Sequence, residues 1–112
     1  MLPKINRLKK KKDFEKIFQE GKSIKAPTTY FRILKTKEPS PRVGFIVSKK
    51  VSLKAVERNK IRRRLRESVR EVLNTLKGGW DIIIVASPRI KKSSFDEIRE
   101  EIEKAFKNIK NV

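Results

Sequence analysis

A dense run of cationic side chains is the feature of this sequence that points most clearly to a chemistry. Basic and amide residues recur through one segment, at Arg58, Asn59, Lys60, Arg62, Arg63, Arg66 and Arg70. From residue 49 to residue 70 the acids are Glu57 and Glu67, whereas solvated helix faces usually alternate in sign. Guanidinium groups bind phosphate oxygens with a planar fork of donors. The pattern therefore predicts a surface for a polyanion with regularly spaced phosphates, with a merely solvated face as the weaker alternative.

An aliphatic stripe in the same segment predicts that residues 56–76 form one helix. The stripe recurs at spacings of three and four, at Ile61, Leu65, Val69, Val72, Leu73 and Leu76. This spacing places the aliphatic side chains on one helical face. Burying that face would hold the arginines in water as a rigid comb. Ser52 is a candidate N-cap for the helix.

The residues that most often carry acid–base or nucleophilic catalysis are missing. The chain has no His and no Cys. Asp13, Glu15, Glu38, Asp81 and the C-terminal acids show no spacing typical of paired carboxylates or metal ligands, so we interpret them as caps, turns or surface charges. We therefore expect no catalytic residue, no metal and no cofactor held by the chain itself.

Composition limits the chain to one domain, residues 1–112, and to a narrow set of partners. Its formal net charge of +18 destabilises a compact fold by self-repulsion, which favours a binding role. Nucleic acid is the first candidate partner. A membrane surface is the weaker one, because the arginine segment lacks the Trp or Phe that membrane-surface helices bury. No run is long enough to span a bilayer, and the absence of Cys fits a reducing cytoplasm.

The other elements predict an α+β domain, a small mixed β-sheet packed with helices in the order α-β-β-α-β-α. After a basic arm at residues 1–12, residues 13–20 form a short helix that ends at Gly21. Strands follow at residues 28–35 and 43–47, and we expect these two to pair as an antiparallel hairpin. The strand at residues 80–86 is almost wholly apolar, so it should be central and buried on both faces. Ser94 and Glu97 have capping-box spacing at the start of a last helix.

Two aromatic residues in the first helix form a second candidate site. Phe14 and Phe18 lie four residues apart on one helical face and are core residues by default. The alternative is that they project over the sheet and stack on unpaired bases. Tyr30, Arg32, Ser48 and Lys49 lie on or beside strands that could line such a groove.

Several of these segments together resemble the protein subunit of bacterial ribonuclease P. Residues 43–50, Val-Gly-Phe-Ile-Val-Ser-Lys-Lys, precede residues 57–67, Glu-Arg-Asn-Lys-Ile-Arg-Arg-Arg-Leu-Arg-Glu, which are similar to that family's Arg-Asn-Arg signature helix. The pattern of Asp13, Phe14, Ile17, Phe18 and Gly21 and the apolar strand at residues 81–85 also match. The resemblance covers residues 6–106. Lys60 stands where the signature usually has its second Arg, so a point charge replaces a fork there.

The resemblance implies that a large RNA subunit performs the chemistry, the Mg²⁺-dependent hydrolysis that removes the 5′ leader from precursor tRNA. The protein would supply no catalytic group. The residues implied to bind the RNA subunit are Arg58, Asn59, Lys60, Arg62, Arg63 and Arg66. Those implied to bind the single-stranded leader in a central cleft are Phe14, Phe18, Ser48 and Lys49, followed by Tyr30 and Arg32.

The family also implies a left-handed βαβ crossover through the signature helix. It further implies one protein per RNA rather than an obligate homo-oligomer, no membrane partner, and a place in the bacterial cytoplasm. A general or ribosomal RNA-binding protein without a role in tRNA processing is the main alternative. That alternative predicts similar affinity for many RNAs and no preference for precursors.

Overall fold

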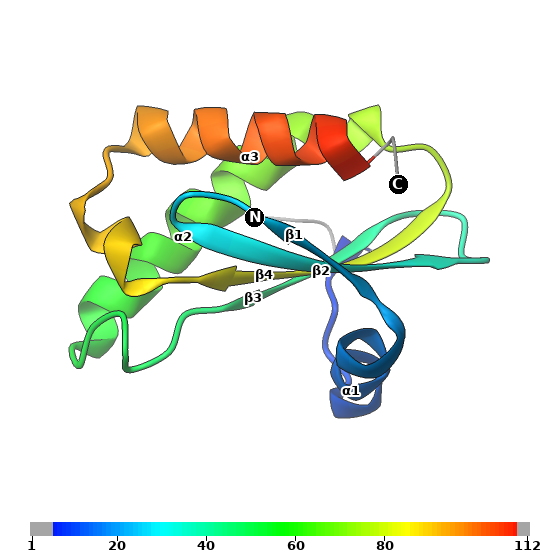
Figure 1. Cartoon of the computed structure of the whole chain (residues 1–112), viewed down its shortest axis with the longest axis horizontal. Coiled ribbons are helices and arrows are strands. Elements are labelled where there is room, and N and C mark those ends of the chain that lie inside the picture. The colour runs from blue at the N-terminus through cyan, green and yellow to red at the C-terminus, as the bar shows by residue number, and fades with distance from the viewer. Residues whose placement is uncertain (1–5, 110–112) are drawn as a thin grey trace.

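A four-stranded sheet with helices on both faces makes up the fold (Figure 1), which a computed structural model describes for residues 6–109. The elements are α1 (Lys11–Glu20), β1 (Lys22–Lys25), β2 (Thr29–Thr36), β3 (Arg42–Ile46), α2 (Ala55–Val72), β4 (Gly79–Ala86) and α3 (Phe95–Ile109), with 3-10 helices η2 (Leu73–Thr75) and η3 (Pro88–Lys92). Helices α2 and α3 cover one face of the sheet and α1 lies against the other. The predicted α+β class is confirmed.

The sheet order is β1-β2-β4-β3, so β4 is an inner strand. Strand β2 pairs antiparallel with β4, and β3 pairs parallel with β4 on its other side. The predicted hairpin between residues 28–35 and 43–47 is therefore wrong. Almost every residue of β4 is buried, and such an apolar strand is best placed with a neighbour on each edge. The loop that contains Pro39 and Pro41 carries the chain from one side of β4 to the other.

Strand β1 is a short edge strand that the sequence pattern does not predict. Its residues, Lys-Ser-Ile-Lys, are mostly exposed, and Ile24 alone among them is apolar. A tight turn, in which Ala26 N donates to Thr29 O over 2.9 Å, joins β1 to β2. The strand is held by pairing with β2 rather than by burial, so hydrophobic periodicity cannot reveal it.

The signature segment forms α2 and links two parallel neighbours, β3 and β4, as the resemblance implies. The hand of this crossover stays a prediction. The helix ends at Val72, and the tighter turn of η2 completes the predicted 56–76 segment. Ser52 is not the cap, because Lys54 precedes the first helical residue and makes no capping hydrogen bond. The Ser52 hydroxyl instead accepts the backbone N–H of Lys54 at 3.2 Å.

Two apolar clusters hold the layers together, one on each face of the sheet. The main core joins the sheet to α2 and α3, and Phe31 meets Phe106 there edge to face at 6.2 Å between ring centroids. The smaller cluster, Leu8, Ile17 and Ile83, lies under α1. Residues 6–8 of the predicted basic arm therefore pack on the sheet, with Leu8 N donating to Val43 O over 3.0 Å. Residues 1–5 of that arm lie outside the described residues.

The start of α3 confirms the predicted capping box. The Ser94 hydroxyl accepts the N–H of Glu97 at 3.2 Å, and the Glu97 carboxylate accepts the N–H of Ser94 at 2.9 Å. The backbone N–H of Ser94, followed by its side chain, lowers the pKa of the Glu97 carboxyl group by favouring its charged form. The capping box fixes where α3 begins, and so how the helix lies on the main core.

Ser94→Ala should lower the free energy of unfolding by about 1 kcal/mol, the usual cost of losing an N-cap side chain. Urea titration followed by circular dichroism measures the change. Ser93→Ala is the matched control, since it alters the neighbouring serine but leaves the capping box intact. Equal losses in the two variants would contradict the capping role.

Candidate nucleic-acid interface

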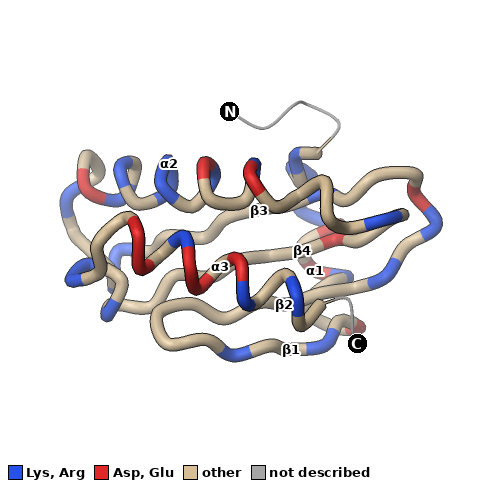
Figure 2. The backbone as a smooth tube through the Cα atoms, turned by 90° about the horizontal axis from the view of Figure 1, so that it is seen from above, with Lys and Arg blue, Asp and Glu red and all other residues tan. Residues whose placement is uncertain are grey.

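Helix α2 turns its aliphatic stripe to the core and its cationic residues to solvent. Ile61, Leu65 and Val69 are buried beneath it. The six predicted RNA-subunit residues lie on this one helix, with Asn59, Lys60 and Arg63 exposed and Arg58, Arg62 and Arg66 partly buried. Acidic residues collect instead on the first half of α3 (Figure 2). The helix therefore presents the comb of cations that the sequence predicts.

Some of these cations are oriented by neighbours before any ligand is present. Arg58 donates to the carbonyl oxygens of Ser52 at 2.9 Å and Leu53 at 3.0 Å, which ties the loop before α2 to the helix. Arg62 donates to the side-chain oxygen of Asn59 at 2.6 Å. Asn59 thus directs a guanidinium group, a role that composition alone does not reveal.

A pocket of about 360 Å³ lies where α2 meets the N-terminal segment and β3. Arg7 and Lys9 line it from the N-terminal segment, and Arg62 and Arg66 line it from α2. Among the described residues, no carboxylate lines this pocket. The sequence pattern places Arg7 and Lys9 only in a basic arm. Their proximity to α2 follows from the pairing of residues 7 and 8 with Val43, which no local pattern predicts.

Positive charge is concentrated in this pocket, and it affects the pKa of Arg66. Partial burial lowers the pKa of this guanidinium group, and the charges of Arg62, Arg7 and Arg63 lower it further. Arg66 keeps its charge at physiological pH all the same, because arginine is effectively always protonated in proteins. The physical meaning is that like charges are held close together here, so an anion that entered would be favoured by all of them.

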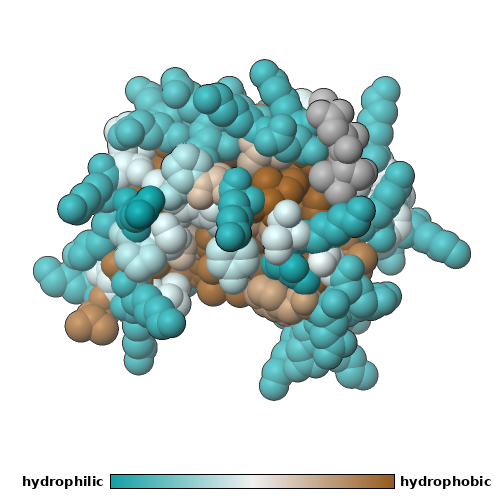
Figure 3. Space-filling model, viewed as in Figure 1, coloured by the Kyte–Doolittle hydropathy of each residue, from teal (hydrophilic) through white to brown (hydrophobic). Residues whose placement is uncertain are grey.

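The opposite face of the sheet carries exposed aromatic surface. Phe18 on α1 is 40% exposed and Tyr30 on β2 is 38% exposed. The register places Tyr30 beside Val85, and Val85 beside Ile46, so a row of apolar side chains crosses three strands next to α1. Figure 3 shows that hydrophilic side chains project from most of the surface seen in that view, with hydrophobic surface visible below α3. An aromatic and aliphatic surface framed by cations suits the stacking of unpaired bases.

Arg32, a predicted leader residue, is engaged with α1. Its guanidinium group donates to the backbone carbonyl of Phe18 and to the hydroxyl of Ser23 at 2.8 Å. A cation at the C-terminal end of a helix also interacts favourably with the helix dipole. Arg32 therefore holds the end of α1 on the sheet and thereby places Phe18.

Phe14 and Phe18 lie in different surroundings although they share one helix. The Phe14 ring rests on Gly44, where an added Cβ would come within 2.4 Å of the ring. Phe14 is partly buried and lines the same pocket as Arg62 and Arg66. Phe18 is exposed. Phe14 is thus partly a packing residue, whereas Phe18 is exposed, and stacking of either ring on bases stays a prediction.

The loop after β3 brings further exposed groups to the head of α2. Ser48 and Lys49 are exposed, as their predicted role requires. Leu53 and Val56 are 84% and 80% exposed, which is unusual for aliphatic residues. No pattern in the sequence marks them, because Val56 lies at the edge of the helical stripe and Leu53 lies in a loop.

The carboxylates that might have served catalysis are engaged in structure. The prediction that Asp81 is a cap, a turn residue or a surface charge is wrong. Asp81 is buried in β4 and accepts two hydrogen bonds from Arg42, at 2.9 and 2.7 Å. Glu101 accepts hydrogen bonds from Thr28 and Thr29. Within residues 6–109, no group of three or more acidic, His or Cys side chains is placed to hold a metal ion. Within the same range, no helix is long and apolar enough to cross a membrane.

Comparison with known proteins places these surfaces in a family. The family model described as Ribonuclease P matches residues 2–110. The "Ribonuclease P protein component" of Clostridioides difficile (strain 630) is 39% identical over 103 residues, covering 91% of this chain and 86% of that protein. The protein of the same name from Cyanothece sp. (strain PCC 7425 / ATCC 29141) is 37% identical, with 91% and 90% covered.

Solved structures agree with the sequence relatives. The RNase P protein of Staphylococcus aureus at 2.0 Å superposes with a TM-score of 0.84 at 32% identity, covering 94% of this chain and 95% of that one. The RNase P protein from Thermotoga maritima gives a TM-score of 0.82 at 29% identity, with 91% and 96% covered. The chain therefore belongs to the ribonuclease P family, as the protein component of the endoribonuclease that processes the 5′ ends of tRNA.

Proposed function

We propose that this protein binds the ribonuclease P RNA subunit through α2 and holds the 5′ leader of precursor tRNA on the sheet face beside α1. The observation that carries the proposal is the position of the two surfaces. The cationic helix α2 covers one face of the sheet, whereas Phe18 and Tyr30 are exposed on the α1 side. Two RNA molecules could therefore bind at the same time without competing for one surface.

On the α2 side, the proposed RNA-subunit residues are Arg58, Asn59, Lys60, Arg62, Arg63 and Arg66. The proposal for these residues is supported by the helix itself, because a rigid helix with a buried stripe presents its cations at regular intervals. A polyanion with regularly spaced phosphates suits such a surface. The pocket lined by Arg7, Lys9, Arg62 and Arg66 adds the N-terminal segment to this surface. Single phosphate contacts there would each release counterions and contribute to affinity.

The proposed leader residues are Phe18 and Tyr30 on the α1 side and Ser48 and Lys49 in the loop after β3, with Arg32 and Phe14 holding α1 in place. A base stacked on Phe18 or Tyr30 would contribute about 1–3 kcal/mol. Stacking of this kind tolerates any base, which suits a leader whose sequence differs from one precursor to the next.

The chain's own residues fit binding better than catalysis. Asp13, Asp81 and Glu101 are occupied by Arg42, Thr28 and Thr29, and the described residues offer no metal-holding cluster. We therefore assign the Mg²⁺ and the hydrolytic step of the holoenzyme to the RNA subunit. We also propose that one protein binds each RNA and that the holoenzyme acts in the bacterial cytoplasm. The protein's contribution is to neutralise phosphates and to position the leader.

Reconstitution tests this proposal directly. Adding the protein to a bacterial ribonuclease P RNA at low Mg²⁺ should give cleavage of a leader-bearing precursor at the mature 5′ end, because bound cations replace part of the Mg²⁺ that screens the phosphates. Gel analysis of timed samples measures the rate. Protein and RNA alone are the controls. Tight RNA binding without stimulated cleavage would favour a general RNA-binding protein instead.

Arg62→Ala and Phe18→Ala should separate the two surfaces. Arg62→Ala should weaken assembly with the RNA subunit, whereas Phe18→Ala should weaken precursor binding by up to about 1–3 kcal/mol while assembly is retained. Filter binding measures both steps. Lys107→Ala, an exposed cation on α3, is the charge-matched control for Arg62→Ala. Phe14→Ala should weaken precursor binding with little loss of assembly, because its ring packs on Gly44 and so helps to hold α1 on the sheet. Equal effects of Arg62→Ala and Phe18→Ala on both steps would refute the two-surface arrangement.

The salt dependence of assembly should count the phosphates engaged. If the protein contacts about six to eight phosphates, the slope of log affinity against log salt should lie between roughly −5 and −7, with the duplex value of about −0.9 per phosphate as an upper guide. Arg62→Ala should reduce the slope by about one contact, and Phe18→Ala should leave it unchanged. A slope near zero would mean that the cations of α2 do not meet phosphates.

A further inference from the structure

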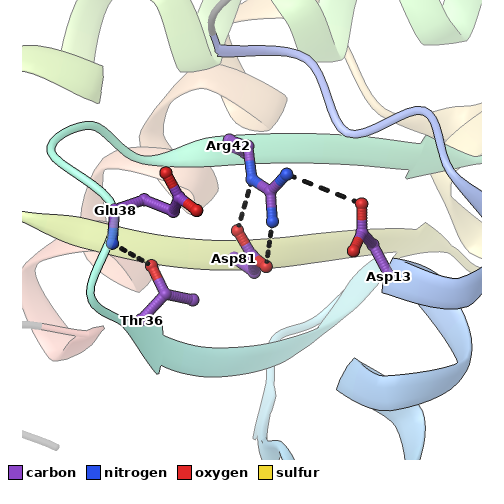
Figure 4. Close-up of polar contacts among 5 residues, drawn as sticks. All are labelled: Asp13, Thr36, Glu38, Arg42 and Asp81. Carbon is purple, nitrogen blue, oxygen red and sulfur yellow. Dashed lines mark hydrogen bonds and ion pairs between the residues drawn. The ribbon is translucent and has the colours of Figure 1, made fainter.

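Arg42 is a cation whose charge is committed to carboxylates rather than left for a ligand. It lies on β3, and its Nε and one terminal nitrogen donate to the two oxygens of Asp81 on β4, at 2.9 and 2.7 Å. Its other terminal nitrogen lies 3.5 Å from an oxygen of Asp13 on α1. Figure 4 shows the three side chains converging from two strands and a helix, with Glu38 nearby.

The two ion pairs differ in what fixes them. Arg42 and Asp81 are direct partners in the parallel register of β3 and β4, and the Asp81 side chain is only 6% exposed. Their bidentate pair raises the pKa of Arg42, as do the charges of Asp13 and Glu38. An RNA phosphate could reach Arg42 only by competing with a buried carboxylate. Arg42 therefore stays bound to Asp81 in the sheet, and its second ion pair, with Asp13, links the sheet to α1.

Helix α1 is anchored by a guanidinium group at each end. Asp13 in its first turn faces Arg42, and the carbonyl of Phe18 near its last turn accepts a hydrogen bond from Arg32. Ile17 is the one fully buried residue of α1, and Phe14 is only partly buried. A helix of ten residues is marginal by itself, so its place on the sheet depends on these few contacts.

We propose that Asp13 and Arg42 are positioning residues for the leader surface. Asp81 fixes Arg42 on the sheet, and the ion pair between Arg42 and Asp13 holds α1 there. Phe18 is thereby kept in place next to the row that contains Tyr30. The proposal rests on the proposed role of that surface in leader binding. Its physical basis is pre-organisation, since the apparent affinity for the leader falls in proportion to the fraction of molecules in which α1 is correctly placed.

The sign of the effect distinguishes this role from simple electrostatics. Removing the charge of Asp13 makes the protein more positive, which by itself should strengthen binding to any RNA. Loss of the anchor should weaken binding, and only for RNA that carries a leader. Asp13 is the better residue to change, because removing Arg42 would leave Asp81 buried without its partner and endanger folding.

The test compares Asp13→Asn with Glu15→Gln, which removes the same charge from an exposed position of α1 outside the ion pairs described here. In the reconstituted holoenzyme, Asp13→Asn should lower affinity for leader-bearing precursor by about two- to fivefold, the range expected for one partly exposed ion pair. Affinity for the same tRNA without a leader, and assembly with the RNA subunit, should not fall. Glu15→Gln should leave precursor affinity unchanged or raise it, and Asp13→Glu should restore it.

Hydrogen exchange of the α1 amides in the free protein provides a second arm that requires no RNA. Asp13→Asn should speed this exchange and Glu15→Gln should not. Similar behaviour of Asp13→Asn and Glu15→Gln in precursor binding would overturn the proposal, even if exchange differed. If the unaltered holoenzyme showed no preference for a leader, the proposed function of this surface would fail. The anchoring of α1 would then be judged by exchange alone, with equal rates overturning it.

Discussion

Burial of β4 on both faces is the constraint on which the rest of the structure depends. An apolar strand of this kind needs a neighbouring strand on each edge and a cover above and below. Strands β2 and β3 supply the edges, α2 and α3 supply one cover, and α1 supplies the other. Because the two covers are different helices, the cationic surface and the aromatic surface come to lie on opposite sides of the sheet. The separation of the two surfaces thus follows from the need to bury β4 on both faces.

The net charge of +18 makes the placement of the acids as informative as that of the cations. Asp81 and Asp13 neutralise Arg42 where two layers meet, and Glu101 accepts hydrogen bonds from Thr28 and Thr29 where α3 crosses the start of β2. Carboxylates are thus used at junctions between elements, and the cations of α2 remain largely unneutralised at the surface. A polyanion that binds only the folded protein would relieve their repulsion and stabilise the fold.

Elements with a long hydrophobic period could be predicted from the sequence, and contacts between distant segments could not. The stripe from Ile61 to Leu76 and the apolar run of β4 each indicate burial through their own residue pattern. The central helix and the buried strand could therefore be predicted correctly. Pairing is different, because β2 and β3 carry no mark that says β4 will come between them. The composition shows that Arg32 and Arg42 are cations, but only the register and the position of α1 reveal that both are held by protein groups. The roles of Arg7 and Lys9 in the α2 pocket were hidden for the same reason.

The strand order has a consequence for the time at which the protein can fold. Strands β2 and β3 do not pair with each other, and each finds its main partner in β4, which comes much later in the chain. While the protein is being synthesised, β2 can pair only with the short edge strand β1, and the neighbouring place of both β2 and β3 at β4 stays empty until β4 has left the ribosome. The cationic segment of α2 precedes β4, so it leaves the ribosome before the sheet exists to fix it. Folding of this chain thus depends on contacts between distant segments, which form more slowly than local contacts do.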